Sequence, residues 1–205
     1  MKIILDNIGK SYHKKQIFQA LNYQFESPNR YGVSGHNGSG KSTFLKILAG
    51  FTTPNSGSIS YSLSGKSIPV ESIFNHISFA APYIDIPQDF NFNELLNFHF
   101  SIKQRLFHKS NEELNSHFNL PTSIPVIQFS SGMLQRVKLA LAFFTKSELL
   151  ILDEPTETLD EQGFELYVDL LNKFTENRIT IIASNKERDF INCIDLISMT
   201  TKNLG

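Results

Sequence analysis

The chemistry that this sequence can support begins with nine residues, GHNGSGKST, at positions 35–43. They match the pattern GxxxxGKS. Glycines let the backbone approach a chain of phosphates, so that successive N–H groups and the start of the following helix face the anion. The lysine adds a charge for the β and γ phosphates, and the serine hydroxyl can coordinate Mg²⁺. We expect this phosphate site to comprise Gly35, His36, Asn37, Gly38, Ser39, Gly40, Lys41, Ser42 and Thr43.

Two acidic residues end an apolar run, LLILDEP, at positions 149–155. Such a run is typical of a strand buried on both faces. Asp153 is placed to hold the magnesium ion, and Glu154 is the candidate general base for an attacking water. The acidic pair alone would be a weak signal, but together with the glycine loop it indicates a triphosphate site with its metal.

The elements that must position these residues alternate between strands and helices. Strand, helix and strand in succession predict a parallel sheet with crossover helices. The expected strands are 2–8, 16–26, 30–34, 57–63, 76–80, 148–153, 178–184 and 195–201, and the expected helices are 42–51, 93–105, 111–118, 132–144 and 159–174. The three helices between about 90 and 145 indicate a helical insertion.

Composition limits the function classes. The chain has 205 residues with 40% apolar and 19% charged residues, which fits one globular domain. A formal charge of −1 disfavours a nucleic-acid partner. Cys193 is the only cysteine, in an apolar phrase typical of a buried position, and the six histidines lack metal-ligand spacing. No apolar stretch reaches the ~18 residues of a membrane span, so we expect a soluble, unexported protein.

The motifs and their order along the chain resemble those of the ATP-binding cassette (ABC) ATPases, the nucleotide-binding subunits of ABC transporters. The resemblance covers nearly the whole chain. Tyr12 stands where the family stacks an aromatic ring on adenine, residues 35–43 match the Walker A loop, and residues 149–155 match Walker B. TETLD, residues 156–160, is similar to the D-loop at the dimer interface, which includes Asp160.

The family signature, LSGGQ, has its counterpart in FSSGM at residues 129–133. In the family this segment caps the γ-phosphate of ATP held by the opposite subunit. Ser130 and Gly132 match, whereas Ser131 and Met133 replace a glycine and a glutamine. The resemblance implies that Ser130, Ser131 and Gly132 act in trans, at the N-terminus of a helix.

Two positions depart from the family pattern. Ala81 and Pro82 stand where the Q-loop glutamine is expected, and the nearest glutamine is Gln88. The switch histidine is replaced by Asn185, whose amide can donate to a phosphate but cannot exchange a proton. Metal contact, signalling to a membrane subunit and turnover are therefore in question.

The resemblance implies an α/β P-loop NTPase fold with a mixed or parallel core sheet, N-terminal antiparallel strands and a helical subdomain. The single domain, 1–205, would divide into a core of 1–86 and 147–205 and a helical subdomain of 87–146. It also implies ATP and Mg²⁺ as ligands and a separately encoded membrane-spanning subunit, which would hold the protein at the cytoplasmic face of the membrane. Phenylalanines that could belong to the core or to a docking groove are Phe90, Phe92, Phe98, Phe100 and Phe107.

Several functions remain open at this stage. The first is an ATP-hydrolysing transporter subunit that forms a homodimer or a heterodimer. The second is a cassette that binds ATP but hydrolyses it poorly, as the degenerate half of a heterodimer or as a regulatory module. A small-molecule kinase built on the same loop would carry an arginine-bearing lid, and the signature-like segment before LLILDEP disfavours it. Cassette proteins of translation or DNA repair usually have paired cassettes or long coiled-coil insertions, and neither is present.

Overall fold

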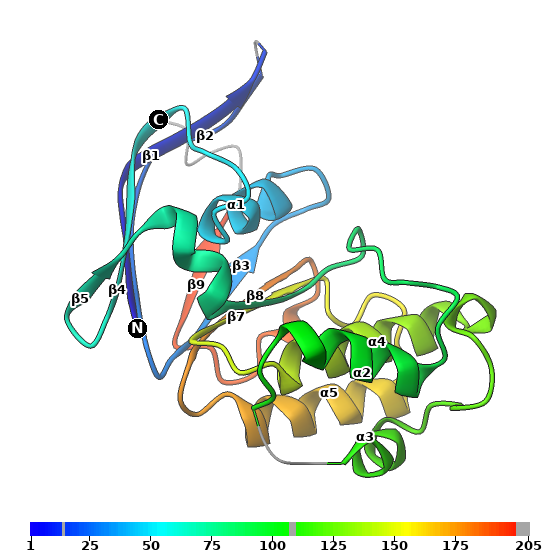
Figure 1. Cartoon of the computed structure of the whole chain (residues 1–205). Coiled ribbons are helices and arrows are strands. Elements are labelled where there is room, and N and C mark those ends of the chain that lie inside the picture. Colours follow the sequence, from blue (N-terminus) through cyan, green and yellow to red (C-terminus); the bar gives the residue numbers. More distant parts are fainter. Residues whose placement is uncertain (14, 107–109, 200–205) are drawn as a thin grey trace.

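A computed structural model of the chain describes residues 1–13, 15–106 and 110–199 (Figure 1). Nine strands and five α-helices lie in this part of the chain. The strands are β1 (Lys2–Tyr12), β2 (Lys15–Glu26), β3 (Arg30–Ser34), β4 (Ser56–Leu63), β5 (Lys66–Ile68), β6 (Ile77–Ala80), β7 (Leu149–Asp153), β8 (Ile179–Ser184) and β9 (Asp195–Ser198). The α-helices are α1 (Lys41–Leu48), α2 (Phe92–Ile102), α3 (Asn111–Phe118), α4 (Ser131–Phe144) and α5 (Glu161–Phe174), and short 3₁₀ helices are η1 (Val70–His76), η2 (Val126–Gln128) and η3 (Glu187–Asp189).

The strands form two sheets. One is antiparallel in the order β2-β1-β4-β5, and the other is parallel in the order β6-β7-β8-β3-β9. The predicted fold is therefore confirmed, with the core sheet parallel throughout and the antiparallel strands in a sheet of their own. The three-residue strand β5 and the helix η1 were not expected from the sequence.

The parallel sheet separates two hydrophobic cores, as the alternation of side chains along β7 illustrates. Leu149 and Ile151 contribute to the core around α1 and the antiparallel sheet, whereas Leu150 and Leu152 contribute to the core of α2–α5. In Figure 1, α1 lies between the two sheets, and α2, α4 and α5 gather on the opposite side of β7 and β8. A strand packed on both faces needs apolar residues at every position, which explains the unbroken run before Asp153.

The helix ends carry local capping interactions. Asn91 and Ser110 each form a capping box, with Glu94 at the start of α2 and with Glu113 at the start of α3. The start of α1 differs, because Gly40 precedes it with a φ of 103°, in the left-handed region. A Cβ atom there would come within 2.3 Å of Ile17 Cγ2, so the glycine is required both by its backbone conformation and by the approach of β2.

Candidate functional site

The residues singled out in the sequence converge at one edge of the parallel sheet. The strands β7, β8 and β3 are neighbours, and all three run in the same direction. Their carboxyl ends are followed by Glu154, Asn185 and Gly35 respectively. Parallel topology thus brings three segments that are far apart in sequence to a single site, which is the usual ligand-binding edge of an open α/β sheet.

The ammonium group of Lys41 lies inside the glycine loop. Its side chain is only 5% exposed, and Nζ donates to the carbonyl oxygens of Gly35 at 2.7 Å and His36 at 3.4 Å. Glu154 Oε1 lies 3.0 Å from the same nitrogen as an ion pair, although the angle is not that of a hydrogen bond. A buried cation surrounded by main-chain groups is the arrangement that a chain of phosphates requires.

Glu154 is held in an unusual backbone conformation at the end of β7. Its φ of 47° is left-handed, which a residue with a side chain rarely adopts without support from its surroundings. The support comes from β8, because Glu154 N donates to Ala183 O at 2.8 Å. Ser184 Oγ lies 3.2 Å from Glu154 Oε2, and the other carboxylate oxygen lies beside Lys41.

Asp153 carries a buried carboxylate beside the hydroxyls of Ser42 and Tyr83. The residue is 1% exposed, and neither Oδ1 nor Oδ2 makes a hydrogen bond to the described residues. Burial raises the pKa of its carboxyl above the usual range, an effect that the nearby hydroxyls of Ser42 and Tyr83 partly offset. Unpaired buried oxygens beside a serine hydroxyl are ligands of the kind that Mg²⁺ prefers, so this pair fits the metal that the glycine loop implies.

Tyr83 is a site residue that the sequence reasoning missed. It follows β6 in the segment where Ala81 and Pro82 stand at the Q-loop position, and no motif includes it. Its ring lies against the helix that carries Ser42, since Lys46 Nζ, one turn further along α1, is 4.2 Å from the ring centroid. Burial raises the pKa of its hydroxyl, and the negative charge of Asp153 raises it further. Gln88 is exposed, and its carbonyl accepts from Ile127 N in the helical insertion.

Asn185 lies beside the glycine loop. Its Nδ2 donates to Asn37 Oδ1 at 3.3 Å, so the position where the family carries a histidine contacts the phosphate loop through an amide. Tyr12, at the end of β1, is 46% exposed and has Lys10 Nζ 5.1 Å from its ring centroid.

The signature-like segment caps α4 and packs on the loop before α5. Ser130 is the N-cap, with its Oγ accepting from Met133 N at 3.2 Å. Thr158 donates to Ser131 O at 3.1 Å, and a Cβ atom on Gly132 would lie 3.1 Å from Thr158 O. Asp160 caps α5 and pairs with Arg136 of α4 at 3.1 Å. The signature-like and D-loop-like segments are therefore one connected unit.

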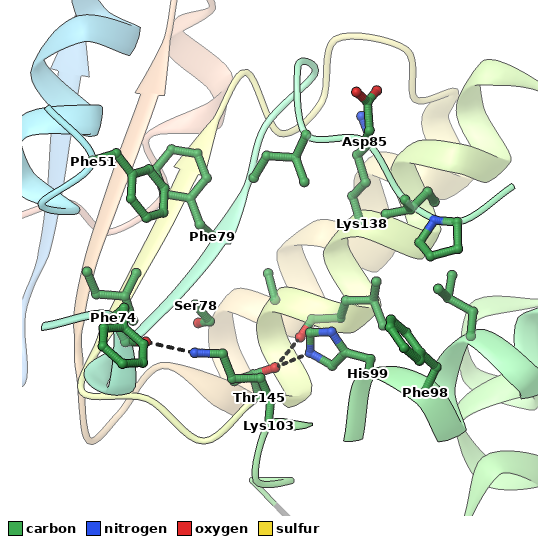
Figure 2. Close-up of a pocket in the computed structure, with 17 residues that line it drawn as sticks. Phe51, Phe74, Ser78, Phe79, Asp85, Phe98, His99, Lys103, Lys138 and Thr145 are labelled. Carbon is green, nitrogen blue, oxygen red and sulfur yellow. Dashed lines mark hydrogen bonds between the residues drawn. The ribbon is translucent and has the colours of Figure 1, made fainter. Parts of the chain in front are cut away.

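A groove of about 400 Å³ lies apart from the phosphate loop, between the β6 region and helices α2 and α4 (Figure 2). Phe51, Phe74, Phe79 and Phe98 line it, and all four rings are labelled in Figure 2. Lys103 Nζ donates to Phe74 O at 2.7 Å, and His99 Nε2 is 2.8 Å from Thr145 Oγ1. Burial lowers the pKa of His99 to about 4, so this ring stays neutral at physiological pH.

The phenylalanines of the helical insertion divide between core and groove. Phe92 is fully buried, Phe90 and Phe100 pack partly buried against the core of α2–α5, and Phe98 is 46% exposed in the groove. Phe107 lies outside the described residues. Cys193 is partly buried in the same core, and burial raises the pKa of its thiol to about 11, which makes it unreactive.

A glycine loop before a helix, a buried aspartate and a neighbouring glutamate on a parallel sheet define a P-loop nucleotide-binding domain. The ABC transporter family model matches residues 18–157, and the chain belongs to this family as an ATP-binding cassette. It is 32% identical to an uncharacterized ABC transporter ATP-binding protein of Bacillus subtilis, over 93% of this chain and 88% of that protein. It is also 32% identical to the lipoprotein-releasing system ATP-binding protein of Buchnera aphidicola, over 87% and 86%.

Solved structures agree on the fold. An ABC transporter ATP-binding protein from Pyrococcus furiosus superposes with a TM-score of 0.81 at 23% identity, covering 97% of this chain and 98% of that one. A dimeric ATP-binding cassette bound to ADP and Pi superposes with a TM-score of 0.80 at 20% identity, covering 96% and 93%. Among the described residues of this chain, none of the helices combines the length and hydropathy that crossing a membrane requires.

Proposed function

We propose that this cassette hydrolyses ATP in the presence of Mg²⁺ and that the reaction drives a separate membrane-spanning subunit. The observation that supports this most strongly is the meeting of Lys41, Asp153 and Glu154 at one sheet edge, with Lys41 and Glu154 3.0 Å apart. Membership of the ABC transporter family points in the same direction.

Each residue has a role that follows from its surroundings. The N–H groups of residues 35–43 and the Lys41 ammonium would bind the phosphates, and Tyr12 would stack on the adenine. Ser42 and Asp153 would hold the metal, which neutralises phosphate charge when bound. Glu154 would accept a proton from the water that attacks the γ-phosphorus, while the bond from that phosphorus to the bridging oxygen breaks and ADP leaves.

A second copy of the chain, or a paralogue, would complete the site. The signature-like residues Ser130, Ser131 and Gly132 begin a helix, and the N–H groups at a helix start favour an anion. We propose that they contact the γ-phosphate held by the opposite cassette. Arg136 lies on α4, the helix that these signature-like residues begin, and it pairs with Asp160. The D-loop-like segment would therefore follow a movement of the signature-like segment.

The alternative is a cassette that binds ATP and turns it over slowly. The contact of Asn185 with Asn37 favours this alternative, since an amide at that position cannot exchange a proton. The loss of the Q-loop glutamine at Ala81 and Pro82 favours it too. The presence of Glu154 beside Lys41 favours hydrolysis.

The Glu154→Gln variant distinguishes the two functions. We expect the wild-type protein to release phosphate from MgATP and the variant to retain its affinity for ATP. The variant should lose roughly 100-fold or more in kcat, which is within the usual range for a general base. Equal and negligible turnover of both proteins, alone and with native membranes, would leave only the slow-turnover cassette.

The groove is the proposed docking site for the membrane subunit. Its aromatic side chains are unusually exposed, with Phe51 60%, Phe74 55% and Phe98 46% exposed. Exposed and contiguous apolar surface marks interaction sites. Docking there would place the protein on the cytoplasmic face of the membrane.

Phe98→Asp tests the docking site, with Ile194→Asp as the matched control because Ile194 is 62% exposed and lies outside the groove. We expect Phe98→Asp to abolish sedimentation with native membranes and the control to sediment like wild type. Equal sedimentation of both variants would assign docking to another surface.

A further inference from the structure

One fully buried carboxylate takes no part in the proposed reaction. Asp189, the last residue of η3, is 0% exposed. Thr156 Oγ1 donates to its Oδ1 at 2.7 Å, and Ser184 Oγ donates to its Oδ2 at 2.6 Å. Thr156 and Ser184 are themselves fully buried, and Tyr167 donates to the Asp189 backbone carbonyl at 2.9 Å. A buried carboxylate is costly unless its hydrogen bonds are made, and here each oxygen has its own donor.

The two donors lie next to the candidate catalytic base. Thr156 is two residues after Glu154, and Ser184 Oγ is 3.2 Å from Glu154 Oε2. The Ser184 hydroxyl therefore has two carboxylates within reach but only one proton. The 2.6 Å contact to Asp189 is the shorter of the two, so the proton lies on the Asp189 side. Lys186 N donates to Ser184 Oγ at 3.0 Å, which further fixes the orientation of the hydroxyl.

We propose that Asp189 is a positioning residue that holds the Ser184 proton away from Glu154. With the Ser184 hydroxyl donating to Asp189 Oδ2, Glu154 Oε2 keeps a lone pair free to accept the proton of the attacking water. This inference rests on the proposed function, because it needs Glu154 to be the base. Thr156 holds the other oxygen of Asp189, so the carboxylate cannot rotate away from Ser184.

The substitution Asp189→Asn tests the inference with little change of shape. An amide NH₂ facing Ser184 would donate to the hydroxyl instead of accepting from it, and the Ser184 proton would then turn to Glu154 Oε2. We expect kcat to fall about tenfold with KM for ATP within about twofold of wild type, in the range of one lost hydrogen bond. Without the Ser184 hydroxyl, Asp189→Asn should no longer lower kcat. The Asp189→Asn, Ser184→Ala double variant should therefore have the kcat of Ser184→Ala alone.

A merely structural role for Asp189 would give a different pattern. In that case Asp189→Asn would lower kcat by the same factor whether or not residue 184 is serine, and this additive result would overturn the inference. Tyr167→Phe is the control, since it removes the buried hydrogen bond to the backbone carbonyl of Asp189 and leaves both carboxylate oxygens with their donors. We expect it to lower stability against urea while leaving kcat within about twofold, in line with one lost hydrogen bond.

If Asp189→Asn does not fold, the double variant still decides the question. In the Ser184→Ala background Asp189 has no Ser184 hydroxyl to orient, so the Asp189→Asn substitution should change kcat by less than about twofold. A larger loss would overturn the inference. The Glu154→Gln variant separates failure of this inference from failure of the proposed function. If Glu154→Gln hydrolyses ATP as fast as wild type, Glu154 is not the base and the proposed function fails. If Glu154→Gln is slow but Asp189→Asn is as fast as wild type, only the role of Asp189 is refuted.

Discussion

Asp153→Asn should make the nucleotide-free protein more stable while it weakens the metal site. Asp153 is 1% exposed, and within the described part of the chain neither of its oxygens makes a hydrogen bond of good geometry. An unsatisfied buried polar group costs ~1–3 kcal/mol, and a charged one costs more. Because the amide remains polar, we expect the variant to recover about 2 kcal/mol. For a chain of 205 residues this corresponds to a rise in Tm of ~4–8 °C, at ~2–4 °C per kcal/mol.

The stabilisation should depend on pH in a defined direction. Burial holds the pKa of Asp153 above its unfolded value. The cost of burying the charged carboxylate in the wild-type protein is therefore absent at low pH, where Asp153 is protonated in both the folded and the unfolded protein. This cost grows as the pH rises through the pKa of Asp153 in the unfolded protein and then through its pKa in the folded protein. The gap between variant and wild type should be largest at neutral pH and should close on acidification. MgATP should also narrow the gap, by ~1.4 kcal/mol for each tenfold loss of affinity in the variant.

The assay is thermal unfolding of both proteins from mildly acidic to neutral pH, with and without saturating MgATP. An Asp153→Asn protein that melts at or below the wild-type temperature at neutral pH without nucleotide would refute the reasoning. A gap that stays constant on acidification would refute it equally, because the stabilisation could not then come from the carboxylate charge.

Two further substitutions test the phosphate loop and the residue that the sequence did not reveal. Lys41→Met removes the buried ammonium that faces the Gly35 and His36 carbonyls. We expect ATP affinity, measured by calorimetry, to fall ~10–100-fold, as for one lost charge-assisted hydrogen bond. An unchanged affinity would exclude Lys41 from the site. Tyr83→Phe removes a hydroxyl that favours the charged form of Asp153, so Mn²⁺ affinity in the presence of ATP, measured by electron paramagnetic resonance, should fall about fivefold. Equal Mn²⁺ binding by Tyr83→Phe and wild type would contradict the place given to this hydroxyl.

The fold was largely predictable because its signals are local. The apolar run 149–152 indicates a strand packed on both faces, and the glycine loop before an apolar helix indicates the strand–loop–helix unit. The strand β5 was missed because three residues on a sheet edge carry no periodicity. The helix η1 was missed for a similar reason, since only Ile73 of its seven residues is buried.

The site was predictable only where a motif names its residues. Lys41, Asp153 and Glu154 follow from two short patterns. Tyr83 and Asp189 do not, because their proximity to the site depends on which strands become neighbours in the sheet. Tyr83 follows β6, which pairs with β7, and Asp189 follows β8, the strand on the other side of β7. A single sequence holds no record of that order.

The ion pair between Lys41 and Glu154 has a consequence for the timing of catalysis. Lys41 Nζ, which would bind phosphate under the proposed function, lies 3.0 Å from Glu154 Oε1. An incoming triphosphate would compete for the same ammonium group and would release Glu154 to accept a proton from water. The proposed base would therefore become available only when the nucleotide is bound.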